Sequence, residues 1–259
     1  TLTADDIQNA SRELTTKLVH EMTSNAADFT FFFVGNIDLE KLRPLVETYI
    51  ASLPADAAKA RKTVGKYNPG MFAKNGSGDN SFSTAMATPQ TLAAVLSFGD
   101  IDFTPKNSQI ASIAGQIMTN RLIKTVREEM GAVYSIGAAG QLSRMGLNPA
   151  MISTSFPMKP EMKKEVLDFI RSQFKAMESD VTEEELAPIK EYMAKSFVQG
   201  KERNGMWMSA LTGYDVNGVD TFNGNVDVLN SITVNDIMDF MKALNAQGNY
   251  RTITLDPAE

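Results

Sequence analysis

The stretch NRLIKTVREEMGAVYSIGAAG, residues 120–140, decides how the rest of the chain is interpreted. Leu122 and Val126 keep a helical spacing, which predicts a helix over the first half of the stretch. Gly131 then ends this helix, as a glycine at a helix C-terminus commonly does. The small, alternating residues at 132–139 predict a strand directly after the glycine.

Two side chains in this stretch are candidates for binding a substrate. Arg127 falls in the last turn of the predicted helix and Tyr134 falls early in the predicted strand, so we expect both to face the same corner. A guanidinium beside a phenol can donate hydrogen bonds to a carboxylate or to a peptide carbonyl. The residues alone leave a structural alternative open. In that alternative Arg127 caps the helix end or pairs with Glu128 or Glu129, and Tyr134 only packs on the strand.

The composition excludes several classes of protein. The chain has 259 residues, and a chain of this length buries enough surface to hold a core without disulfides. Its net charge of −6 argues against a nucleic-acid partner. No apolar run approaches the roughly 20 residues that a membrane-spanning helix needs. We therefore expect no nucleic acid and no membrane span.

The histidine and cysteine counts bear on metal chemistry. A catalytic zinc is held by three protein ligands, nearly always including two histidines. The chain has one histidine, His20, and no cysteine. His20 and Glu21 are similar to half of a zinc motif, but no second histidine completes HxxEH or HExxH. We predict no catalytic residue and no metal ligand in this chain, and interpret His20 as a polar residue near a helix end.

The order of the predicted elements indicates an α+β fold. Strands are predicted at 81–88, 91–98 and 147–156, helices cluster after them, and a strand at 250–255 closes the chain. We expect a mainly antiparallel sheet with helices packed on one of its faces.

The starts of several helices are marked by capping residues. Thr3, Asp38, Thr182 and Thr233 each stand directly before a helical pattern and are predicted to cap it. Pro44 lies inside one of these helices and is expected to bend it.

Composition also divides the chain into three parts. Residues 1–55 contain helical patterns on either side of the apolar segment 29–34, which predicts a strand buried on both faces. This part is interpreted as the tail end of a preceding α/β domain. Residues 56–80 are rich in Lys and Gly and predict a linker. Residues 81–259 form the predicted α+β C-terminal domain.

Three segments of the chain resemble the pitrilysin/insulysin (inverzincin) family of zinc metallopeptidases, which includes bacterial members. They are LTADDI at 2–7, FVGNID at 33–38, and the run from NRL to YS at 120–135. The segments occur in the order of the family, and the resemblance extends over nearly the whole chain. The third segment is the most specific of the three.

The resemblance implies two similar halves that enclose a chamber. The N-terminal half carries HxxEH and a distant Glu, and the C-terminal half supplies an Arg and a Tyr, seven residues apart, that bind substrate. Arg127 and Tyr134 have this spacing. The chain is thus expected to be the C-terminal substrate-binding half of a zinc-dependent endopeptidase, inactive alone. Its zinc would be held by an N-terminal half that is absent from this chain.

The same resemblance implies partners and a compartment. The N-terminal catalytic half, in the same chain or in a partner subunit, and a peptide substrate are the expected partners. Zinc is expected in the complete protein and not in this part of it. Bacterial relatives suggest the periplasm or the cell envelope.

Two other functions stay open at this point. The first is a non-catalytic partner or assembly subunit of the same fold, which also fits the missing zinc motif. The second is a stand-alone carbohydrate- or peptide-binding domain. The Arg127 and Tyr134 pair favours the substrate-binding half, because a pure scaffold has no need of it.

Overall fold

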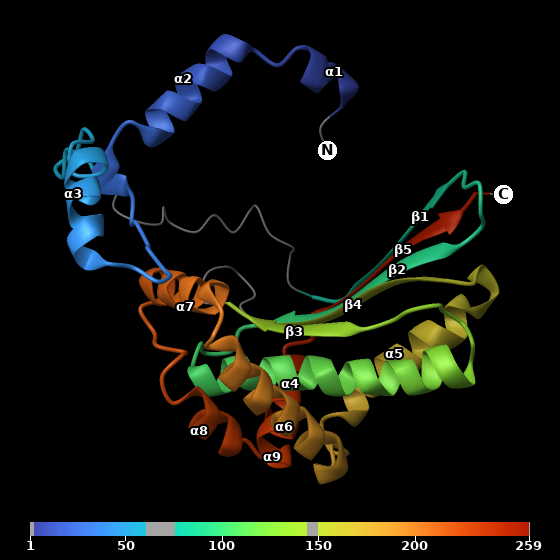
Figure 1. Ribbon diagram of the computed structural model, residues 1–259. Helices are drawn as coiled ribbons and strands as arrows, with labels where there is room; N and C mark the ends of the chain where they lie inside the picture. Colours follow the sequence, from blue (N-terminus) through green and yellow to red (C-terminus); the bar gives the residue numbers. More distant parts are fainter. Residues whose placement is uncertain (1–2, 61–75, 144–149, 259) are drawn as a thin grey trace. The chain divides into compact units, whose positions relative to one another are not determined.

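The computed structural model describes residues 3–60, 76–143 and 150–258. The chain divides into two compact units, Thr1–Lys66 and Tyr67–Glu259 (Figure 1), and each is described by itself. Most of the predicted linker lies outside the described residues.

The described part of the first unit is helical. Thr3 caps the first helix with a capping box and Asp38 caps the last one, as predicted. The first predicted helix is divided in two because Ser11 caps a second start. The elements are α1 (Ala4–Gln8), α2 (Arg12–Thr23), the 3₁₀ turn η1 (Ala26–Asp28) and α3 (Leu39–Tyr49).

The prediction of a buried strand at 29–34 is wrong. The segment forms no strand, and Phe29, Phe31 and Phe33 are 44%, 42% and 45% exposed. A strand needs a neighbour for its backbone N–H and C=O groups, and residues 3–60 contain no strand that could pair with this segment. The apolar pattern is that of a sheet strand, but these residues offer no sheet for it to join.

The second unit is built on one five-stranded sheet with the order β1-β5-β2-β4-β3. β1 and β5 are parallel, and all other neighbours are antiparallel. This confirms the predicted, mainly antiparallel sheet. The strands are β1 (Gly78–Thr84), β2 (Thr91–Gly99), β3 (Ala138–Leu142), β4 (Ala150–Met158) and β5 (Tyr250–Pro257).

The helices of this unit cover one face of the sheet (Figure 1), which confirms the predicted α+β layering. Thr182 and Thr233 cap α6 and α9 with capping boxes, as predicted. Among the described residues, no helix is both long and apolar enough to cross a membrane. The helices are α4 (Pro105–Leu122), the π-helix η3 (Ile123–Glu129), the 3₁₀ turn η4 (Pro160–Met162), α5 (Lys163–Ala176), α6 (Glu183–Gly200), α7 (Asn204–Asn217), α8 (Asn225–Asn230) and α9 (Val234–Asn245).

The core lies between the sheet and the helices. Alternate residues of β2, such as Ala93 and Val95, are buried, and so are Ile113 and Ile117 of α4. On the opposite sheet face Leu92 is 40% exposed. The single covered face explains the alternating burial along β2 and β4.

Helix α4 and strand β3 are in backbone contact. A side chain on Gly115 would overlap the backbone nitrogen of Gly140, and one on Gly140 would overlap the Ala111 carbonyl. Thr119 Oγ1 donates to the Ala138 carbonyl at 2.9 Å and accepts from the Ala138 N–H at 2.8 Å. These contacts fix β3 against the helix that leads to Arg127.

Candidate functional site

Arg127 lies in a π-helical turn that continues directly from α4. The turn, Ile123–Glu129, is stabilised by backbone hydrogen bonds that span more residues than those of an α-helix. The N–H of Met130 donates to Thr125 at 2.9 Å, and the N–H of Ala132 donates to Val126 at 3.1 Å. Turns of this kind occur frequently at functional sites, because the extra residue changes where side chains point.

The connection after this turn differs in part from the prediction. Gly131 has a φ of +59°, which confirms that it ends the helix. The strand predicted at 132–139 is wrong in its first part, because β3 begins only at Ala138. Val133 and Ile136 are both buried, three residues apart, so burial does not alternate here as it would on a strand.

Tyr134 projects from this irregular connection into solvent. Tyr134 is 92% exposed although Val133 and Ile136, one residue before it and two after it, are buried. The backbone below it is held by the N–H of Lys159, which donates to the Ala132 carbonyl at 3.2 Å. Tyr134 also borders an open pocket of about 320 Å³. The other walls of this pocket are residues 88–90, 131–133 and 157–159.

Arg127 is also exposed. Within the described residues neither Arg127 nor Tyr134 makes a side-chain hydrogen bond or ion pair, including with each other. Arg127 therefore has no ion pair with Glu128 or Glu129 there, and the exposure of Tyr134 disagrees with a packing role. Their convergence on one corner, and their role in binding, stay predictions.

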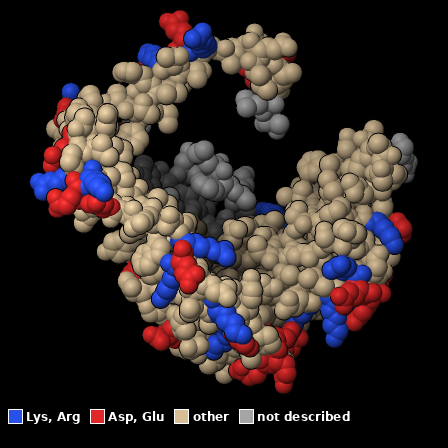
Figure 2. Space-filling model, in the orientation of Figure 1, with Lys and Arg blue, Asp and Glu red and all other residues tan. Residues whose placement is uncertain are grey.

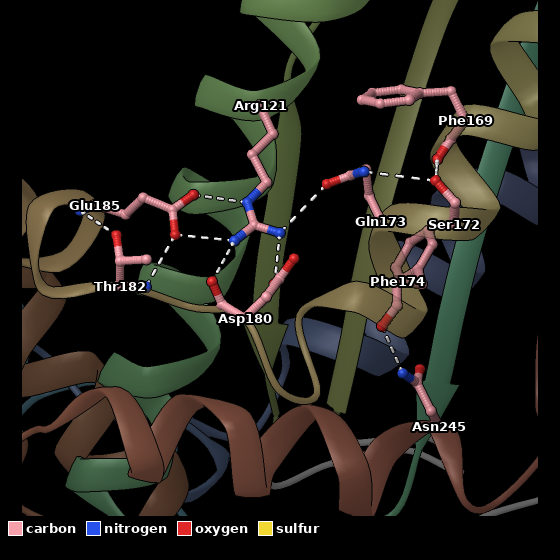
Figure 3. A network of polar contacts seen from close by, with 9 residues as sticks. All are labelled: Arg121, Phe169, Ser172, Gln173, Phe174, Asp180, Thr182, Glu185 and Asn245. Carbon is pink, nitrogen blue, oxygen red and sulfur yellow. Dashed lines mark hydrogen bonds and ion pairs between the residues drawn. The ribbon is translucent and has the colours of Figure 1, made fainter.

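A polar network around Arg121 anchors the end of α4, two residues before the π-helix begins (Figure 3). Arg121 donates from Nε to Glu185 Oε1 at 2.6 Å and from Nη2 to Glu185 Oε2 at 2.9 Å. Arg121 Nη1 also reaches Asp180 Oδ1 at 2.9 Å and Gln173 Oε1 at 3.3 Å. Glu185 Oε2 accepts the Thr182 N–H at 3.1 Å, so the same carboxylate caps α6.

The network favours the charged forms of both partners. Burial opposes charge on each, but their mutual hydrogen bonds raise the pKa of Arg121 and lower the pKa of Glu185. In the sequence Arg121 stands out only as part of the NRL motif, and no pattern there indicates its pairing with Glu185. The two partners are 64 positions apart in the sequence, so no local signal connects them.

A zinc site does not fit the residues of this chain. His20 lies on the exposed helix α2. In the described ranges, no cluster of three or more His, Cys, Asp or Glu side chains could hold a metal ion.

The family follows from comparison with known proteins. Residues 17–193 match the family model described as the peptidase M16 inactive domain. This match covers more than half of the chain, so the chain belongs to that family, the non-catalytic half of M16 proteases. The predicted resemblance to pitrilysin-like zinc proteases is thereby confirmed.

Solved structures of similar fold agree with this assignment. The ferredoxin protease FusC, in complex with Arabidopsis ferredoxin, matches 100% of this chain with a TM-score of 0.81 and 17% identity. The periplasmic protease PqqL from Escherichia coli matches 86% with a TM-score of 0.68 and 16% identity. A peptidase M16 inactive domain from Pseudomonas fluorescens matches 99% with a TM-score of 0.75 and 16% identity.

At these identities the likeness shows the fold alone. The chain spans 28% of the FusC chain, 25% of the PqqL chain and 60% of the Pseudomonas fluorescens chain. A comparison with curated proteins found no match.

Proposed function

We propose that this chain is the substrate-binding half of a zinc-dependent endopeptidase, and that Arg127 and Tyr134 bind the peptide. One observation carries the proposal. Tyr134 is 92% exposed although Val133 and Ile136 in the same connection are buried, and the backbone of this connection is held by a hydrogen bond. A large aromatic side chain in this position contributes little to the core, and its hydroxyl is available for a ligand.

The two side chains suit the groups of a peptide. The Arg127 guanidinium offers several N–H donors and the Tyr134 hydroxyl offers one more. Both can donate to a peptide carbonyl, or to the oxyanion that forms when that carbonyl is attacked. A hydrogen bond to a charged group of this kind contributes about 1.5–3 kcal/mol.

The catalytic part of the reaction belongs to another half in this proposal. Because the described residues contain no cluster that could hold zinc, the metal and the general base would come from a catalytic half in the same chain or in a partner subunit. FusC, a protease in complex with a protein, supports a polypeptide as the ligand class. The periplasmic relative PqqL supports the periplasm or cell envelope as the compartment.

The test is turnover of a peptide by the complete protein, with its catalytic half present. We expect Arg127→Ala to lower turnover tenfold or more, equivalent to about 1.4 kcal/mol. Lys124→Ala is the matched control, because Lys124 is an exposed cation on the same π-helix. Turnover that is unchanged by Arg127→Ala would contradict the role.

The same preparation also distinguishes the proposed function from the alternative, a non-catalytic partner subunit. In that case the complete protein would contain no zinc and cleave no peptide. About one zinc per protein, together with cleavage, supports the substrate-binding half.

A further inference from the structure

Strand β1 has one edge without a neighbour among the described strands. It is seven residues long and stands at the end of the strand order, so β5 is its one neighbour among the described strands. Natural edge strands are commonly protected by Lys, Pro or a bulge. β1, with the sequence GDNSFST, has no Lys, Arg or Pro, and Phe82 is 59% exposed.

Two cavities of about 390 and 440 Å³ share Arg171 in their lining and are together called the groove. The first lies between β1, β5 and helix α5, and the second is also lined by residues of β2 and α9. The first cavity lies against residues 79–81 of β1. The second is lined by Ser77, Phe174 and Tyr250 among others.

The charges along the groove are balanced. Each Lys or Arg that lines the cavities is paired with a carboxylate at 2.6 Å. The pairs are Lys163–Asp256, Lys164–Asp168, Arg171–Asp79 and Lys175–Glu178. Figure 2 likewise shows both signs of charge side by side over the helices of this unit. This pattern does not favour a phosphate or a nucleic acid, which requires an excess of positive charge.

Tyr250 supplies an uncharged polar group to the groove. Its hydroxyl is buried and has no hydrogen-bond partner among the described residues. The ring packs edge-on against Phe174 at 5.6 Å, and the Arg171 guanidinium lies 5.7 Å from its centre. Burial raises the pKa of Tyr250 to about 12, although Arg171 acts in the opposite direction, so the hydroxyl keeps its proton at neutral pH.

We propose that the groove between β1 and α5 binds an extended, largely uncharged peptide segment, which adds to β1 as a further strand. Backbone hydrogen bonds to the free edge supply affinity in this mode, and pockets beside the edge take alternate side chains. The proposal does not rest on Arg127 or Tyr134.

The test uses the 259-residue chain and an unfolded probe, reduced α-lactalbumin alkylated with iodoacetamide. Hydrogen exchange is measured at residues 78–84 with and without the probe. We expect the probe to slow amide exchange in β1 and to leave exchange in β3, at the other end of the strand order, unchanged. If the probe causes no slowing, or if every β1 amide is already protected in the free protein, the proposal is wrong.

Two variants make the test specific. Phe82→Lys places a charge on the edge strand and is expected to weaken probe binding tenfold or more. Leu92→Lys is the matched control, because Leu92 is an exposed apolar residue in the same cross-strand row, two strands from the edge. It should stay within about twofold of the wild type, since its side chain is far from the added strand.

The second variant, Tyr250→Phe, removes only the hydroxyl. It should weaken binding several-fold without lowering the unfolding temperature, because the hydroxyl has no partner to lose. Equal affinities of Phe82→Lys and the wild type would overturn the proposal. The variant Arg127→Ala should bind the probe at β1 like the wild type, so failure here is distinguishable from failure of the proposed peptidase role.

Discussion

Arg121 and Glu185 are joined by two parallel hydrogen bonds, of 2.6 and 2.9 Å, although they belong to helices α4 and α6. The arginine side chain is only 14% exposed. Because Glu185 also accepts the N–H of Thr182, one carboxylate both caps α6 and ties it to α4. The pair therefore connects the helix that leads to Arg127 with the helical layer (Figure 3).

Arg121→Ala should destabilise the fold substantially. It leaves Glu185, which is partly buried, without its main cation, and such a loss costs about 2–4 kcal/mol. The measurement is the free energy of unfolding in urea. The variant Lys124→Ala, which removes an exposed cation nearby, should change it by less than about 0.5 kcal/mol. Equal effects of the two variants would show that the network contributes nothing.

Stability should fall in acid, and part of this fall should depend on Arg121. Burial acts to raise the pKa of Glu185, but the bonds from Arg121 and Thr182 lower it below the usual 4.5. A lowered folded-state pKa stabilises the fold above the unfolded value, and this contribution is lost as pH falls through the folded value. Urea unfolding of wild type and Arg121→Met between about pH 7 and pH 3 checks this. The variant should show the flatter curve, and parallel curves would contradict the assignment.

Two Gly→Ala changes should have opposite signs. Gly115→Ala puts a methyl group against the backbone of β3, 2.8 Å from the carbonyl carbon of Ala139, and overpacking of this kind costs about 1–3 kcal/mol. Gly213→Ala in α7 meets no atom within 4 Å and should stabilise by about 0.5–1 kcal/mol, because alanine favours helix. Denaturation midpoints measure both. A tolerated Gly115→Ala would show that α4 and β3 can separate at little cost.

Features that depend on neighbours in the chain could be predicted from the sequence. The capping boxes at Thr182 and Thr233 involve a partner three residues away, so the motif itself contains both halves of the interaction. Gly131 could be placed for a similar reason, since the left-handed conformation that ends a helix favours glycine. The strand predicted at 91–98 is likewise present, as β2 at Thr91–Gly99.

Features that depend on distant partners could not be predicted. The segment 29–34 has the composition of a buried strand, but residues 3–60 contain no strand to pair with it. The π-helix at Ile123–Glu129 has the same apolar spacing as an α-helix would, so its extra residue was not visible. For Arg121, no local pattern indicates which of the many acidic residues it meets.

Arg127→Ala and Tyr134→Ala should separate binding from stability. Both side chains are exposed and make no polar contact within the described residues, so each change should alter the free energy of unfolding by less than about 0.5 kcal/mol. Arg121→Ala, only six residues before Arg127, should cost several times more because its partners are fixed. The measurement is urea unfolding of the three variants under the same conditions. A loss above about 1 kcal/mol for Tyr134→Ala would mean that the exposed ring supports the fold. That result would contradict the proposal that the Tyr134 side chain is exposed in order to bind a peptide.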